Sequence, residues 1–224
     1  MSDQPSSPAH DVDASQIKID KLFATPVARL QHPDFERLNR ELRAVILARE
    51  ASQPSTDHSN EGGWQSTDDF AEWSGPAGAQ LLAFAQEMAN QLSAVNSPEH
   101  GLIEAKLTWT CAAWANINRS GHGNGVHGHP GAYWSAVYWV DDGGRADDPA
   151  LGGELEFVDP RGVMPTMLYP ALRMRIEGCL TAGFMSKLAP SAGSLVMFPS
   201  WLLHSVKPHK GTRARISIAF NFGL

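Results

Sequence analysis

The sequence predicts a mainly β domain of the α+β class, in which two amphipathic helices precede a barrel or sandwich of short strands. Composition is the first reason: 20 glycines, 15 prolines and seven tryptophans among 224 residues are typical of short strands joined by tight turns. The second reason is a change of apolar spacing near residue 106, from helical periodicity to short β-prone runs. With 42% hydrophobic residues, the chain is long enough to bury one sizeable core.

The segment before the strands is predicted to hold a leader and two helices. Residues 1–16 are rich in Ser, Pro and Asp and lack periodicity, so we expect a disordered leader before a single domain at residues 17–224. Apolar residues recur at helical spacing over about residues 34–50 and again over about residues 77–96. Each stripe predicts a helix with one face against the core. An irregular loop containing the sequence GGWQS at residues 62–66 joins them.

The strands are predicted to form the barrel over about residues 106–224. Five β-prone runs separated by Gly- and Pro-rich turns occur there, at residues 107–118, 133–140, 154–158, 194–198 and 213–222. Residues 161–190 have no clear pattern and are compatible with a hairpin, a lid or an insertion.

Charge and cysteine content exclude several classes of function. A net charge of -6 without a basic stripe argues against a nucleic-acid partner. Cys111 and Cys179 are too few for a disulfide framework or a thiolate zinc site, and we expect both to be buried, reduced thiols. No stretch approaches the roughly 20 apolar residues of a membrane span. We therefore expect a cytoplasmic protein that acts on a small molecule without a membrane partner. The oligomeric state is not readable, and a homodimer is compatible with the sequence.

Three histidines indicate a metal site. His127 and His129 are two residues apart, so on an extended strand both side chains point to the same side. His204 follows an apolar strand and a tight turn, and would supply a distant third ligand. Imidazole suits iron, zinc, copper or nickel, and three ligands on one side leave positions open for a chelating co-substrate and O₂. An isolated His-x-His pair in a glycine-rich loop is also a common chance event.

A basic residue and a hydroxyl downstream indicate a carboxylate site. Arg215 and Ser217 share one face of the last predicted strand, and a guanidinium with a nearby hydroxyl suits bidentate binding of a carboxylate. A dicarboxylate ligand fits this demand. Arg213 lies on the same face by parity and is the reserve candidate. Asn116 and Asn118 precede the histidines on a strand and can hydrogen-bond a co-substrate or substrate, or equally local backbone groups.

At these residues the chain resembles a bacterial family of 2-oxoglutarate/Fe(II) oxygenases related to the prolyl-hydroxylase group. The segments that carry the resemblance occur in the same order over most of the chain from residue 22 onward. They are GGWQS at 62–66, WANIN at 114–118, HGHP at 127–130, SAVYWV at 135–140, GGELEFVDP at 152–160, FPSWLLH at 198–204 and RISIAFN at 215–221.

The resemblance implies a double-stranded β-helix, a cupin-like jelly-roll barrel buttressed by the N-terminal helices. It implies that His127 and His204 bind Fe(II) and that Arg215 binds the far carboxylate of 2-oxoglutarate. In relatives the segment around Tyr138 contributes a tyrosine to the same pocket. The implied reaction uses O₂, decarboxylates 2-oxoglutarate to succinate and oxidises a C–H bond of the substrate, commonly by hydroxylation. A free amino acid or similar small polar metabolite is the expected substrate class.

The chain departs from better-known relatives at His129, where they have a carboxylate. A three-histidine triad is the favoured interpretation, which removes one negative charge from the iron centre. A carboxylate from Glu154, Glu156 or Asp159 is the alternative. A third register, with His129 as the first ligand and Gly131 at the vacant position, resembles halogenases and is disfavoured. Desaturation and cyclisation are further outcomes that the sequence does not separate from hydroxylation.

Two rival functions remain open at this stage. One is a three-histidine iron dioxygenase that does not use 2-oxoglutarate, against which the Arg215 and Ser217 pair argues. The other is a non-catalytic jelly roll that binds a metal or ligand. Production of succinate separates both rivals from the favoured assignment.

Overall fold

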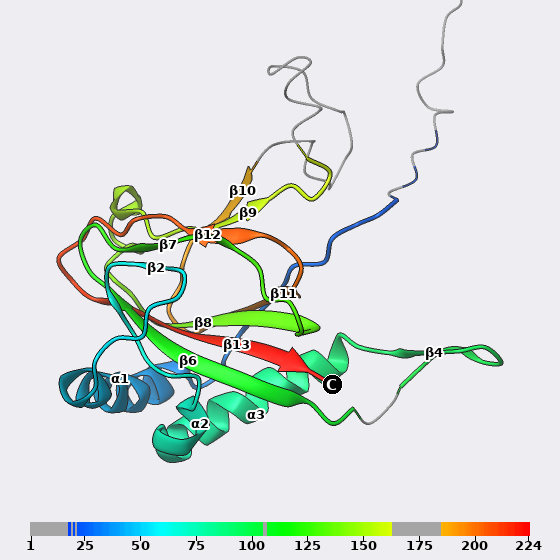
Figure 1. Ribbon diagram of the computed structural model, residues 1–224, viewed down its shortest axis with the longest axis horizontal. Coiled ribbons are helices and arrows are strands. Elements are labelled where there is room, and N and C mark those ends of the chain that lie inside the picture. The colour runs from blue at the N-terminus through cyan, green and yellow to red at the C-terminus, as the bar shows by residue number, and fades with distance from the viewer. Residues whose placement is uncertain (1–17, 19, 21, 105–106, 163–184) are drawn as a thin grey trace, which may run out of the picture.

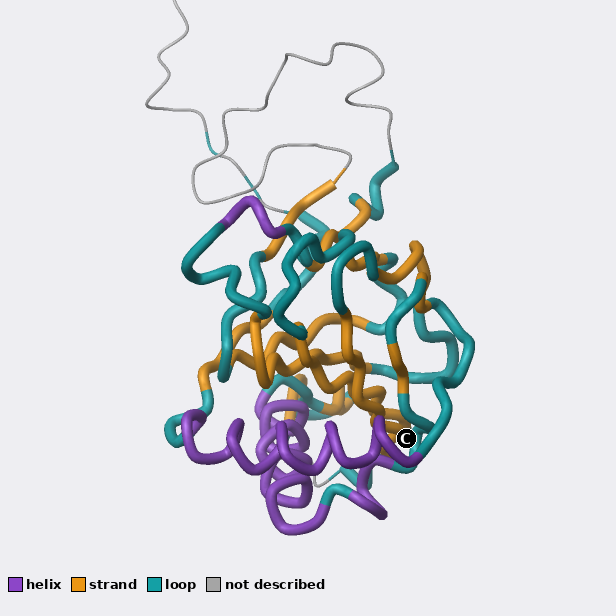
Figure 2. Tube along the Cα trace, turned by 90° about the vertical axis from the view of Figure 1, so that its left-hand side faces the viewer, coloured by secondary structure: helices purple, strands orange, loops and turns teal. Residues whose placement is uncertain are grey.

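The structure is a computed structural model that describes residues 18, 20, 22–104, 107–162 and 185–224. The predicted leader at residues 1–16, Cys179 and most of the 161–190 stretch lie outside the described residues. Two antiparallel sheets face each other, and helices cover the outer face of the larger one (Figures 1 and 2). The predicted class, mainly β with helices buttressing a jelly-roll barrel, is confirmed.

The larger sheet has six strands in the order β1-β11-β8-β13-β6-β3. Their bounds are β1 Ala28–Gln31, β3 Trp64–Gln65, β6 Thr110–Asn118, β8 Trp134–Asp142, β11 Ser194–Pro199 and β13 Arg215–Gly223. The three long strands β6, β8 and β13 are central and lie where the sequence predicted β-prone runs. The short β1 and β3 at the edges were not predicted, because strands of two to four residues carry little periodicity.

The smaller sheet has five strands in the order β10-β9-β12-β7-β2. Their bounds are β2 Asn60–Glu61, β7 Gly123–His127, β9 Leu155–Val158, β10 Met185–Leu188 and β12 His204–Val206. A separate hairpin of β4 (Val95–Ser97) and β5 (Gly101–Ile103) projects away from the barrel (Figure 1). A 3₁₀ turn, η2, spans Pro149–Leu151.

Three helices form the layer below the larger sheet, α1 (Phe35–Ser52), α2 (Phe70–Trp73) and α3 (Gly75–Gln91). The apolar stripe of α1 places Leu38, Leu42 and Ile46 in the core with no exposed surface. Leu81 and Ala85 of α3 are equally buried. No helix within the described ranges is both long and apolar enough to span a membrane.

Strand alternation gives the larger sheet two different faces. Tyr138, Ile218 and Phe220 belong to the hydrophobic core shared with the helices. The alternate position Trp139 belongs instead to a second core inside the barrel, together with Phe157 of the smaller sheet. The inner face is therefore where the two sheets meet, and it carries the candidate site. Cys111, the second residue of strand β6, is exposed, so the prediction that it is buried was wrong.

Candidate active site

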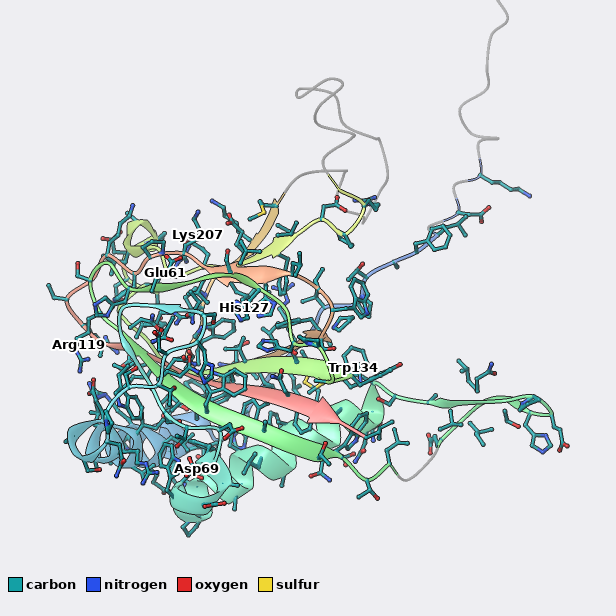
Figure 3. The ribbon with its side chains drawn as sticks, viewed as in Figure 1. Glu61, Asp69, Arg119, His127, Trp134 and Lys207 are labelled. Atoms are coloured by element: carbon teal, nitrogen blue, oxygen red, sulfur yellow. The ribbon has the colours of Figure 1, made fainter. Side chains whose placement is uncertain are left out.

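Three histidines from two neighbouring strands meet inside the barrel mouth. His127 at the end of β7 is the direct cross-strand partner of His204 at the start of β12. His129 follows two residues later, and its backbone N–H donates to the Ser200 carbonyl, which turns the chain back over the barrel. One ring nitrogen of each histidine lies within 4.8 Å of those of the other two. Figure 3 places His127 between the two sheets.

Backbone carbonyls orient two of these rings. Nδ1 of His127 lies 2.8 Å from the Gly125 carbonyl oxygen, and Nδ1 of His204 lies 2.8 Å from that of Leu202. Because a carbonyl only accepts hydrogen bonds, each Nδ1 must carry the proton, which leaves Nε2 of each ring with a free lone pair. This is the arrangement that a metal-binding imidazole requires.

Burial keeps the histidines neutral. Desolvation lowers the pKa of His204 to about 3, with the neighbouring His127 adding to the effect. Desolvation likewise lowers the pKa of His129 to about 4, and the pKa of His127 is lowered for the same reason. All three rings therefore offer lone pairs near neutral pH, and together they can hold a divalent metal ion with positions left open for other ligands.

The carboxylates considered as alternatives to His129 point elsewhere. Glu154 binds Arg145 at 2.8 Å, and Asp159 binds Arg161 at 2.8 Å. Glu156 lies between Lys187 and Lys207, each 3.6 Å away, because alternation turns it to the opposite face from its neighbours. Within the described part of the chain, the group able to hold a metal contains only the three histidines. The structure therefore does not support a carboxylate from the 152–160 segment.

A row of polar side chains crosses the inner face of the larger sheet beside the histidines. Cross-strand pairing aligns Gln65, Asn116, Ser217 and Trp139 on strands β3, β6, β13 and β8. Two residues further along these strands, Asn118 of β6 pairs with Arg215 of β13. Paired residues of an antiparallel sheet point to the same face, so these side chains all lie on the inner face of the larger sheet. The predicted residues Asn116, Asn118, Arg215 and Ser217 are thus brought together.

Arg215 is a buried cation without an ion-pair partner among the described residues. Its residue exposure is 1%, and its closest polar contact is a long one, 3.4 Å from Nη1 to Oδ1 of Asn118. Its Nε has no hydrogen-bond partner within the described part of the chain. Desolvation lowers the pKa of Arg215 to about 10, so the guanidinium still carries its charge near neutral pH. A buried, unpaired guanidinium is costly, and an anionic ligand would offset that cost.

A small inner cavity joins Arg215 to the histidines. It has a volume of about 50 Å³ and is lined by Asn116, His127, His204, Arg215, Ser217 and Trp139, among others. At roughly 10–15 Å³ for one water-sized group, this admits about four such groups. A carboxylate and the adjoining methylene fit that space, whose lining includes both the cation and the three histidines.

Trp139, not Tyr138, faces this cavity. The Tyr138 hydroxyl donates to Oδ1 of Asn39 on α1 at 2.7 Å, on the helix side of the sheet. The prediction that Tyr138 binds the co-substrate was therefore wrong. Trp139 lines the cavity, is fully buried and has an Nε1–H without a hydrogen-bond partner in the described residues. Trp139 is the cross-strand partner of Ser217, so knowledge of the strand register would have identified Trp139 as a residue of this cavity.

The reserve candidate Arg213 lies outside the cavity. It precedes β13, its side chain is 57% exposed, and it pairs with Asp141 at 2.9 Å. His209, to which the sequence gave no role, lies closer to Arg215. It is fully buried and donates from Nε2 to the Arg213 carbonyl, and its Nδ1 has no partner among the residues that the structure describes. A methyl group placed on Gly153 would lie 3.0 Å from Cδ of Arg215 and 3.8 Å from Nδ1 of His209. The two side chains therefore border the same glycine.

A second, much larger hollow opens on the other side of the histidines. This outer groove has a volume of about 920 Å³. Its walls come from the loop before α2 and from strands β6 and β7, and Trp114, His127 and His129 form its inner end. The arrangement provides a metal site with a small anion-binding cavity behind it and a wide, solvent-open groove in front of it.

Comparisons with known proteins agree with this geometry. Residues 112–221 match the family model described as "Putative 2OG-Fe(II) oxygenase". No curated protein sequence matches the chain.

Solved structures with the same fold cover nearly all of the chain. A Pseudomonas putida prolyl-4-hydroxylase matches with 20% identity and a TM-score of 0.58, over 89% of this chain and 92% of its own. A Trichoplax adhaerens prolyl hydroxylase, solved with a peptide fragment of hypoxia inducible factor, matches with 15% identity and a TM-score of 0.60, over 88% and 83%. HygX from Streptomyces hygroscopicus, solved with nickel and 2-oxoglutarate bound, matches with 12% identity and a TM-score of 0.56, over 89% and 83%.

The match extends from within β6 to within β13 and includes all three histidines and Arg215. The residues present suit both groups that the family uses, since neutral imidazoles suit Fe(II) and a buried unpaired guanidinium suits a dicarboxylate. Residues 112–221 thus belong to the 2OG-Fe(II) oxygenase family, and the protein is a non-haem iron dioxygenase that depends on 2-oxoglutarate.

Proposed function

We propose that His127, His129 and His204 hold the iron and that the enzyme hydroxylates a C–H bond of a small polar metabolite such as an amino acid or a derivative. The balanced reaction takes substrate, O₂ and 2-oxoglutarate to hydroxylated substrate, succinate and CO₂. When bound, the iron supplies the activation of O₂ on which this oxidation depends. We further propose that residues 17–224 act as one catalytic domain.

The protein's own contribution at the metal is orientation. Protons at Nδ1 of His127 and His204 are held by the backbone carbonyls of Gly125 and Leu202, which keeps each Nε2 available as a donor. Three neutral ligands leave the metal with its full positive charge, so an anionic co-substrate is attracted more strongly than it would be in a site with a carboxylate ligand.

The observation that carries the proposal is the buried, unpaired Arg215 on the wall shared with the histidines. We assign it the far carboxylate of 2-oxoglutarate, with Ser217 and the Nε1–H of Trp139 as further donors. Asn118 orients the guanidinium by accepting from Nη1, and Asn116 lies beside Ser217 on the same wall. The other end of the co-substrate then lies towards the metal, while the outer groove stays free for the substrate.

The test is an anaerobic titration of the metal-free protein with Fe(II) and then 2-oxoglutarate, followed by visible absorption. A weak charge-transfer band on adding 2-oxoglutarate supports the assignment. Arg215→Leu should bind iron and lose the band, whereas Arg213→Leu, which changes an exposed arginine two residues away, should keep it. An undiminished band in Arg215→Leu would contradict the proposed role of Arg215. Iron binding without any band in the wild type would favour an oxygenase that does not use 2-oxoglutarate.

A further inference from the structure

The outer groove carries an electrostatic signature that bears on the substrate. Its lining includes two carboxylates, Glu61 and Asp68, and no lysine or arginine. Both carboxylates are exposed, and neither forms an ion pair with another described residue. The groove therefore presents negative charge that the protein leaves uncompensated.

The two carboxylates belong to opposite sides of the groove. Glu61 lies on β2, which pairs with β7 of the smaller sheet, and its Oε1 would be 3.2 Å from a methyl group placed on Gly125, two residues before His127. Asp68 lies beside β6 of the larger sheet, where its backbone carbonyl accepts from the Ala113 N–H. Both carboxylates line the same groove as His127 and His129.

A buried amide points to a ligand independently of the charge. Gln65 is 4% exposed and lines the groove, yet its side-chain amide has no hydrogen-bond partner among the described residues. The amide keeps access to the groove, so it is free to donate to or accept from a ligand that binds there. It lies next to Asn116 across β3 and β6, at the end of the polar row that leads to the co-substrate cavity.

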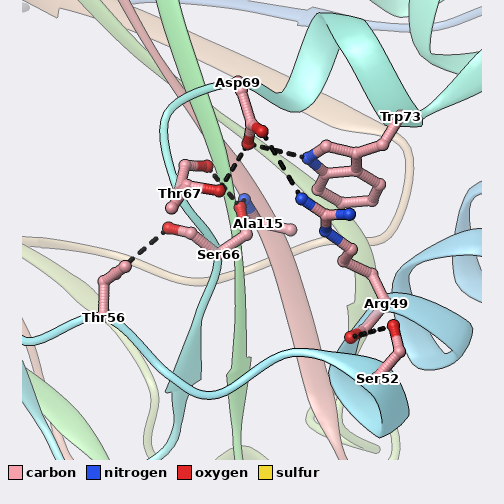
Figure 4. A network of polar contacts seen from close by, with 8 residues as sticks. All are labelled: Arg49, Ser52, Thr56, Ser66, Thr67, Asp69, Trp73 and Ala115. Atoms are coloured by element: carbon pink, nitrogen blue, oxygen red, sulfur yellow. Dashed lines mark hydrogen bonds and ion pairs between the residues drawn. The ribbon is translucent and has the colours of Figure 1, made fainter.

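The wall that carries Gln65 and Asp68 is held in place by its own contacts (Figure 4). Thr56 donates from Oγ1 to the carbonyls of Gln65 and Ser66, and the Ser66 hydroxyl accepts from the Ala115 N–H of β6. Asp69 accepts from the indole of Trp73 at 3.1 Å and pairs with Arg49 at 3.4 Å. The position of the groove wall is thus fixed before a ligand arrives, which lowers the cost of binding.

We propose that the substrate carries a positive charge, an ammonium or guanidinium group, which binds between Glu61 and Asp68 with the Gln65 amide as a further hydrogen-bonding partner. This inference rests on the proposed function, because it takes the outer groove as the path of the substrate to the metal. The groove selects against anionic compounds of the same size by the same electrostatics. The charged end stays in the solvent-open part of the groove, and the carbon to be oxidised extends towards His127 and His129.

The test uses small probes that differ in charge and little else. Mn(II) replaces iron in the 2-oxoglutarate complex, and the protein is offered n-butylammonium, n-butanol and n-butanesulfonate at pH 8, where an ordinary histidine is uncharged. Paramagnetic relaxation of each probe's proton signals measures its residence near the metal, with the Zn(II) complex as the diamagnetic reference. We expect n-butylammonium to be relaxed roughly two- to fivefold more than n-butanol, the range for one exposed ion pair, and n-butanesulfonate least.

Matched variants decide whether the groove causes the preference. The double variant Glu61→Gln and Asp68→Asn should remove the preference for the cation, and raised salt should weaken it. Glu87→Gln, which changes an exposed carboxylate on α3 below the larger sheet, should leave it intact. Equal relaxation of n-butylammonium and n-butanol, or a preference that survives in the double variant, overturns the inference. The charge-transfer band of the iron complex is read separately, so a failed inference with the band present leaves the proposed function standing.

Discussion

Trp139 and Ser217 are direct cross-strand partners on the inner face of the larger sheet, and the register of β8 and β13 shifts between Ile216 and Ser217. The shift lets Arg215 pair with Asp142 while Ser217 pairs with Trp139, so one residue of β8 is left without a counterpart. The indole N–H, the hydroxyl and the guanidinium consequently border one small cavity.

Replacing Trp139 with Phe should weaken 2-oxoglutarate binding by roughly 10- to 100-fold, because a hydrogen bond to a charged acceptor is lost while the aromatic bulk stays. Titration of the iron complex, followed by its charge-transfer band, measures the change. Tyr138→Phe is the matched control, since it removes a hydroxyl that binds Asn39 on the helix side. It should cost about 1 kcal/mol of unfolding free energy and leave the affinity for 2-oxoglutarate unchanged. Equal affinities of Trp139→Phe and the wild type would exclude the donor role.

Each metal ligand should be essential for iron binding. His127→Ala, His129→Ala and His204→Ala should each abolish stoichiometric iron, as measured by metal analysis after anaerobic loading. His129 is the most informative position, because a residue that merely supports a ligand typically costs only about 10–100-fold in metal affinity. His100→Ala, in the projecting β4–β5 hairpin, is the control and should bind iron normally. Full iron occupancy in His129→Ala would remove this residue from the triad.

The metal-free protein should lose stability as the pH falls below about 6.5. The folded state keeps His129 and His204 neutral, with pKa values of about 4 and about 3, whereas the unfolded chain protonates both near 6.5. The unfolded state therefore takes up protons first, so the stability present above pH 6.5 is lost as the pH falls towards 4 and 3. Urea unfolding at a series of pH values measures this slope. The non-titrating variant His129→Asn should show a shallower slope, and an unchanged slope would contradict the burial argument.

Gly153 should be required for co-substrate binding. Its φ of +74° disfavours other residues, and an added methyl group would lie 3.0 Å from Cδ of Arg215. Gly153→Ala should therefore lose stability and also displace the guanidinium, which would weaken 2-oxoglutarate binding. Gly101→Ala separates the two effects, because Gly101 has a φ of +71° and open space around it. It should lose about 1–2 kcal/mol from the backbone alone and leave 2-oxoglutarate binding intact.

The sequence was sufficient to predict the elements whose patterns are local. The helical stripes led to α1 and α3, and the two-residue spacing of His127 and His129 placed both on one side of the chain. Arg215 and Ser217 were paired by the same parity, and the structure places both on the wall of one cavity. In each case a single segment contains the whole signal.

Features that depend on pairing between segments were not predictable. Tyr138 and Trp139 are adjacent aromatics, and only the packing of α1 against one face of the sheet decides which of them reaches the cavity. The carboxylates of the 152–160 segment looked available for the metal until their partners Arg145, Lys187 and Lys207 were known. Gln65 lies in the GGWQS segment that carries the resemblance, but its unpaired amide is recognised only once its surroundings are in place.

The acceptors that orient His127 and His204 are both main-chain carbonyls, each two residues before the histidine it holds. Every amino acid supplies such a carbonyl, so no single substitution at position 125 or 202 deletes the acceptor itself. The path of the main chain therefore determines which nitrogen of each imidazole carries the proton. A carboxylate acceptor, in contrast, could be removed by a single substitution. Substitutions that change this metal site should therefore fall on the histidines themselves or on the walls of the inner cavity and the outer groove.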